Sequence, residues 1–100
     1  MKRFSGKHEG DLNLSGDLEL AGVVTGTVTV PPGAYLRMSG LIAGNLVVER
    51  KARAKISGVV DGSVINNGGT VHVSGIVGRV LDQFEGVTTV DPRAFVRNSD

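Results

Sequence analysis

Apolar residues recur at every sixth position of the chain between Leu12 and Val60. The residues of this series are Leu12, Leu18, Val24, Val30, Leu36, Ile42, Val48, Ala54 and Val60. Within the same stretch, three Gly-x-x-x-Gly motifs, each enclosing an apolar pair, begin at Gly22, Gly40 and Gly58, so the motif recurs every 18 residues. A period this short is typical of a β-solenoid. Each unit is expected to form one coil with three short sides of about six residues, stacked on its neighbours through parallel strands.

Apolar and polar residues alternate between the glycine motifs, which is the pattern of half-buried β-strands. In a stack of coils, residues one coil apart lie above one another and form columns. The pattern predicts four inward-facing columns: Leu12/Val28/Leu46/Val64, Leu14/Val30/Val48/Asn66, Leu18/Leu36/Ala54/Val71 and Leu20/Met38/Ile56/Val73. Such a narrow, aliphatic interior fits a chain with 40% hydrophobic but only 4% aromatic residues.

The sequence therefore predicts an all-β fold, with one three-sided parallel β-helix of about five to six coils over residues 1–100. Residues 1–10 have a glycine frame without the apolar pair and are expected to form a ragged start. Residues 86–99 align without a gap with residues 26–39, so residues 86–100 are expected to form the last coil. Residues 79–85 then form an insertion before that coil.

Val80, Leu81 and Phe84 of this insertion would share one face of a helical turn. The insertion is expected either to contact a partner or to act as a flap over exposed core. The alignment also places Thr88 above Val64 and Asn98 above Val73. Polar residues at interior positions of a last coil are what a capping repeat needs, so this end is expected to be closed.

Composition and charge narrow the classes of function. The formal net charge of +1 implies no bulk affinity for nucleic acid or acidic lipid. The chain has no cysteine, which excludes disulfides and thiolate metal sites. No apolar run approaches the length of about 18 residues that a membrane span needs, and Met1-Lys2-Arg3 is not followed by a signal-peptide core. We therefore expect a soluble, cytoplasmic protein.

The glycine corners, with Gly10-Asp11-Leu12 and the stretch Ile56-Ser57-Gly58-Val59-Val60-Asp61-Gly62-Ser63-Val64, resemble the bactofilins. The resemblance covers residues 10–78 and extends to residues 86–99 through the internal repeat. It implies a right-handed, three-sided β-helix and a cytoskeletal protein whose coils stack end to end into filaments without bound nucleotide, often at a membrane. We expect Phe4 at one end, and Phe95 with Val96 at the other, to supply the apolar contacts for self-association.

Two outward-facing sets of residues suggest a second possibility, a small partner-binding module of the antitoxin, immunity or adaptor type that does not polymerise. The first set is an apolar stripe: Val23, Leu41, Val59 and Ile76. A contiguous exposed apolar stripe marks an interface unless the insertion or the N-terminal segment folds over it. The second set is a basic column, with one basic residue beside it: Arg37, Lys55, His72 and Arg97, with Arg53. It would bind an acidic protein or an anionic lipid surface, or serve as an ordinary solvated face.

No catalytic, cofactor or metal site is expected. His72 faces outward, and spacing supplies it with neither a nucleophile nor a carboxylate. His8 has only Glu9 and Asp11 nearby, which is a weak metal-ligand pattern. The sequence contains no P-loop, Rossmann fingerprint or nucleophile elbow. Nucleic acid is not expected as a partner because aromatic residues do not interleave with the basic ones. We therefore expect a structural or binding protein and not an enzyme.

Overall fold

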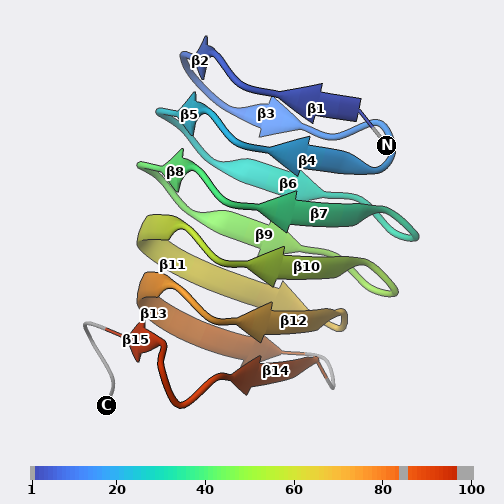
Figure 1. Ribbon diagram of the computed structural model, residues 1–100. Coiled ribbons are helices and arrows are strands. Elements are labelled where there is room, and N and C mark those ends of the chain that lie inside the picture. The colour runs from blue at the N-terminus through green and yellow to red at the C-terminus, as the bar shows by residue number, and fades with distance from the viewer. Residues whose placement is uncertain (1, 84–85, 97–100) are drawn as a thin grey trace.

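The computed structural model describes residues 2–83 and 86–96, and these residues form a parallel β-solenoid with no helix (Figure 1). The chain passes through three sides in turn, so that each coil adds its strands next to those of the coil before. The first side is a 6-stranded sheet of β1 (Lys2–Phe4), β4 (Leu18–Leu20), β7 (Tyr35–Met38), β10 (Arg53–Ile56), β12 (Thr70–Val73) and β14 (Val87–Val90).

The other two sides belong to one 9-stranded sheet that bends around a corner. The second side holds β2 (Lys7–His8), β5 (Val23–Val24), β8 (Leu41–Ile42), the start of β11 (Val59–Asn67), the start of β13 (Ile76–Gln83) and β15 (Phe95–Val96). The third side holds β3 (Leu12–Asn13), β6 (Val28–Val30), β9 (Leu46–Val48) and the later parts of β11 and β13. All of these pairings are parallel, as predicted.

The strand register confirms the columns expected from the sequence. On the first side, Leu36 lies between Leu18 and Ala54, and Ala54 lies next to Val71. The columns that contain Met38 and Leu46 are likewise formed as predicted, and the column of Val48 is formed from Val30 to Asn66. Their registers are Leu20/Met38/Ile56/Val73, Leu12/Val28/Leu46/Val64 and Val30/Val48/Asn66. Period-2 alternation therefore assigns side chains to the interior correctly over the first four coils.

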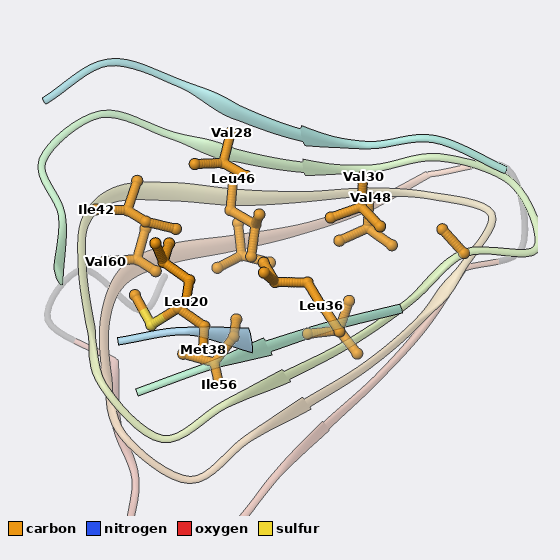
Figure 2. Close-up of a cluster of buried hydrophobic side chains, with 14 of the residues drawn as sticks. Leu20, Val28, Val30, Leu36, Met38, Ile42, Leu46, Val48, Ile56 and Val60 are labelled. Atoms are coloured by element: carbon orange, nitrogen blue, oxygen red, sulfur yellow. The ribbon is translucent and has the colours of Figure 1, made fainter. Parts of the chain in front are cut away.

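Aliphatic side chains fill the space enclosed by the three sides (Figure 2). Leu20, Leu36, Met38, Ile42 and Ile56 have no exposed surface at all. Full burial of such a side chain contributes about 1.5–3 kcal/mol, so the columns supply most of the driving force for folding. A coil cannot bury its own apolar face alone, and its stability depends on the coil above and the coil below.

Glycines stand one above another at the corner between the first and second sides. A Cβ atom built on Gly40 would lie 2.0 Å from the carbonyl oxygen of Gly22, and one on Gly58 would lie 2.1 Å from that of Gly40. The same carbonyls accept ladder hydrogen bonds, such as the 3.0 Å bond from the Leu41 N–H to Gly22. Only glycine lets successive coils approach this closely, which explains the 18-residue glycine period.

The N-terminal segment is more regular than expected. Residues 2–4 and 7–8 are strands in register with the next coil, with Phe4 next to Leu20 and His8 next to Val24. Lys7 and His8 therefore take the positions that the apolar pair Val23-Val24 occupies in the next coil, and the rings of Phe4 and His8 meet edge to face at 6.3 Å between centroids. The prediction of a ragged start at residues 1–10 was wrong for these strands.

The prediction of an insertion at residues 79–85 was also wrong. Residues 79–83 continue β13 along the third side, where Val80 lies next to Val64 and Leu81 next to Ile65. The register shifts at the preceding corner, between Val60 and Ser63 of β11. This coil is therefore shorter than 18 residues. β13 continues through residues 79–83, where the 18-residue period of the sequence is interrupted. Phe84 lies outside the described residues.

The last coil has a different register from that expected. Thr88 lies next to Val71 and Phe95 next to Ile76, whereas Val80 occupies the position above Val64 that was assigned to Thr88. The alignment of residues 86–99 with residues 26–39 therefore matches strands that lie on different sides of the solenoid. Both segments contain the same tight turn, with a hydrogen bond from the Ala34 N–H to Pro31 in one and from the Ala94 N–H to Asp91 in the other. Asn98 lies outside the described residues.

Candidate interaction surfaces

The apolar interior reaches the N-terminal end of the solenoid without full cover. Phe4, Leu12 and Leu18 pack against the core but are only partly buried. A hollow of about 350 Å³ opens beside them, lined by Lys2 and residues 12–18. The strands β1, β2 and β3 have no further strand beyond them among the described residues. This end therefore presents both apolar surface and free strand edges.

The C-terminal end also exposes apolar residues of the interior columns. Val90 continues the column of Val73 and is 43% exposed. Val96 continues the column of Val77 and is partly buried, as are Ala94 and Val80. Of the residues predicted for self-association, Phe4 and Val96 lie in these interior columns, at opposite ends.

A polar network replaces the apolar columns at one corner of the C-terminal end. The Asn66 side chain is fully buried, and its Nδ2 donates to the carbonyl of Val87 at 3.0 Å and to Thr88 Oγ1 at 3.1 Å. Its Oδ1 accepts a 2.8 Å hydrogen bond from the Gly69 N–H, and the Thr88 hydroxyl donates to the Asp82 carboxylate. A buried amide is tolerated when its partners are supplied in this way. The sequence had assigned Thr88 to the position above Val64, whereas Thr88 lies next to Val71 and belongs to this network.

The apolar stripe predicted on the second side is formed. Val23, Leu41 and Val59 are neighbours in consecutive coils and are half-buried, and Ile76 is 36% exposed. Residues 79–83 do not cover this stripe because they lie on the third side. Phe95, at 60% exposure, extends it into the last coil. The alignment of residues 86–99 with residues 26–39 matches Phe95 to Tyr35 of the first side, and the Ala-Phe-Val run lacks the glycine motif that marks the second side elsewhere.

The basic column is also formed on the first side, where Arg37, Lys55 and His72 occupy the same position in three consecutive coils. Arg53 stands beside this column, with its guanidinium 5.4 Å from the centre of the Tyr35 ring. The next position in the column is taken by Thr89, where Arg97 was expected. Arg97 itself lies outside the described residues.

A hollow of about 370 Å³ runs between the two outward rows of the first side. It is lined by Tyr35, Arg53, Ala54, Lys55, Thr70 and His72. Because Arg53 and Lys55 both project from β10, two cationic side chains flank the same hollow. This arrangement suits recognition of an anionic group.

Acidic residues mark both limits of the basic column. Glu19 precedes Arg37 in the column and forms ion pairs of 3.5 Å with Arg3 and 4.0 Å with Arg37. Asp91 follows β14, and a 2.9 Å hydrogen bond from the Arg93 N–H holds the pKa of its carboxyl below the usual value. Partial desolvation opposes this lowering of the pKa, and the charges of Arg93 and His72 reinforce it.

The described residues contain no cluster of three or more His, Cys, Asp or Glu side chains that could hold a metal ion. In residues 2–83 and 86–96 we also find no helix long and apolar enough to span a membrane. No family model matches the sequence, and neither a curated protein nor a solved structure matches it.

Proposed function

We propose that the protein is a bactofilin-like cytoskeletal scaffold that associates with copies of itself through the two ends of its solenoid, without a nucleotide. The observation that carries the proposal is that apolar columns run through the interior and are incompletely covered at both ends. The partly buried apolar residues that pack on the core are all at these ends: Phe4, Leu12, Leu18, Val80, Ala94 and Val96. In this proposal the scaffold works in the cytoplasm.

The physical argument combines two effects. Free strand edges at an end of a solenoid pair with any compatible edge that they meet, because their backbone groups lack partners. Burying apolar surface in the same contact gains about 25 cal/mol per Å². The hollow beside Leu12 and Leu18 gives an incoming apolar side chain a place to pack. An end contact would therefore continue the hydrogen bonding and the packing that already hold the coils together.

Charge substitutions at the ends test this proposal. Val96→Glu places a carboxylate in the interior column at one end, and Leu12→Glu does the same at the other, so each is expected to shorten the assemblies and both together to leave monomers. Size-exclusion chromatography with light scattering measures the mass, and electron microscopy shows any filaments.

The matched control is Val23→Glu, since Val23 lies on an outward face of the second side. It should leave the assembly unchanged, and circular dichroism should show the same β-signal for every variant. A wild-type protein that stays monomeric at high concentration would contradict the proposal, as would assemblies that Val96→Glu and Leu12→Glu leave intact.

A second function, that of a non-polymerising partner-binding module, is favoured by one observation. The Asn66, Thr88 and Asp82 network closes one corner of the C-terminal end with polar groups, which discourages continued stacking there. Such a module would bind its partner through the apolar stripe or the basic column. A single monomer or dimer in light scattering over a range of protein concentrations would support this function over the first.

A further inference from the structure

The basic residues of the chain are concentrated in one part of the first side and the turn that leads to it. Residues 37–55 contain five of the 11 Lys and Arg residues but only one of the 10 Asp and Glu residues, Glu49. The rest of the chain is therefore net negative, although the formal charge of the whole is +1. This concentration of charge is hidden by the overall composition.

The cationic side chains of this region are exposed and close together. Arg37, Arg50, Lys51, Arg53 and Lys55 are all exposed. Adjacent coils of a parallel sheet are about 4.8 Å apart, which brings Arg37 and Lys55 into mutual repulsion. Among the ion pairs between described residues, only the 4.0 Å pair of Arg37 with Glu19 involves one of the five. A partner that neutralised these charges would remove the repulsion.

The shape of this surface selects the kind of partner. The hollow between the two outward rows has Arg53 on one wall, Lys55 on the other and the backbone at Ala54 between them. A groove between two rows of side chains fits an extended chain that lies along the solenoid axis. The basic region is also limited in length, because Glu19 precedes Arg37 in the column and Asp91, which pairs with Arg93 at 3.6 Å, follows β14.

From these observations we infer that the first side is a docking groove for a short acidic peptide segment of another protein. Carboxylates of the segment would pair with Arg53 and Lys55, and His72 and Arg37 would extend the contact into the neighbouring coils. A flat lipid surface fits less well, since it would also meet the acidic residues at both limits of the groove. The groove is separate from the solenoid ends, so it serves the scaffold and the partner-binding module equally.

The test measures binding of fluorescein-labelled octaglutamate by fluorescence anisotropy, with octaglutamine as the uncharged peptide. The wild-type protein should bind octaglutamate in low salt and bind octaglutamine negligibly. Lys55→Glu and Arg53→Glu should each weaken octaglutamate binding by about tenfold or more. The affinity of the wild type should also fall as salt is raised, because exposed charges are screened.

Lys7→Glu is the matched control, since it makes the same charge change at an exposed lysine on the second side. It should change octaglutamate binding by less than about twofold. Equal losses in Lys7→Glu and Lys55→Glu would overturn the inference, because binding would then follow net charge alone. Failure of the wild type to bind octaglutamate would also overturn the inference. If the protein then cosedimented with phosphatidylserine vesicles and Lys55→Glu abolished this cosedimentation, the partner would be an anionic lipid surface.

Discussion

Gly40→Ala is expected to destabilise the fold by about 3 kcal/mol or more. The new Cβ atom would lie 2.0 Å from the Gly22 carbonyl oxygen and 2.8 Å from the Ala21 carbonyl carbon, and both are backbone atoms of the coil before. Relief would require the two coils to separate, which breaks the ladder hydrogen bond from Leu41 to Gly22. Urea denaturation followed by circular dichroism, at a protein concentration low enough to keep the chain monomeric, measures the loss.

The control for this variant is Gly16→Ala. A Cβ atom on Gly16 meets no atom within 4 Å, and its backbone does not adopt a positive φ. The control should therefore leave the free energy of unfolding unchanged or raise it by a fraction of a kcal/mol, through a less flexible unfolded chain. Similar stabilities for the two alanine variants would show that the glycine corner does not limit the spacing of the coils.

Truncation within the interior columns should have an effect of similar size. Ile56 has no exposed surface and lies between Met38 and Val73 in its column, so Ile56→Ala should cost about 2–5 kcal/mol. The upper part of this range is expected, because strand ladders hold the coils at a fixed spacing and prevent collapse around the cavity. Chemical denaturation of the monomeric variant measures the change.

Ile65→Ala provides the comparison, since Ile65 belongs to β11 but is only half-buried and lies outside the interior columns. The same chemical change there should cost about 1 kcal/mol or less. Equal costs at the two isoleucines would contradict the assignment of inward and outward positions along the strands.

The first four coils could be predicted from sequence because two independent signals agree there. Alternation assigns Leu36 and Ala54 to the interior, and the 18-residue glycine spacing assigns them to adjacent coils. Side-chain alternation and coil period both follow directly from backbone geometry, so a single sequence carries them.

The last two coils could not be predicted in the same way because the first and third sides have the same alternating pattern. The Gly86-to-Val90 segment is similar to the Gly26-to-Val30 segment, yet the first leads into β14 on the first side and the second into β6 on the third. The turns that follow the two segments have the same length and the same hydrogen bond, so the incorrect alignment contains no gap. The deciding feature is the register shift between Val60 and Ser63, which depends on how the corners of β11 and β13 pack.

The candidate interaction surfaces were likewise predicted correctly on the regular coils and incorrectly on the last coil. The apolar stripe and the column of Arg37, Lys55 and His72 were predicted correctly, because they depend only on the regular coils. Phe95 was assigned to the wrong side because its position depends on the shortened coil. The hollow between Arg53 and Lys55 was not predicted, since the depth of a surface depends on neighbouring side chains that alternation does not describe.

Disulfide cross-linking tests the stacking of residues 18 apart most directly, because the chain has no cysteine of its own. Arg37 and Lys55 lie side by side in adjacent coils, at a Cα spacing of about 4.8 Å that a disulfide can bridge, whereas Arg37 and His72 are two coils apart. Under mild oxidation of dilute protein, Arg37→Cys/Lys55→Cys should form an intramolecular disulfide rapidly and completely, as read by mass spectrometry, and Arg37→Cys/His72→Cys should not. Equal or slower cross-linking of the 37/55 pair would contradict the stacked solenoid on which every proposed surface depends.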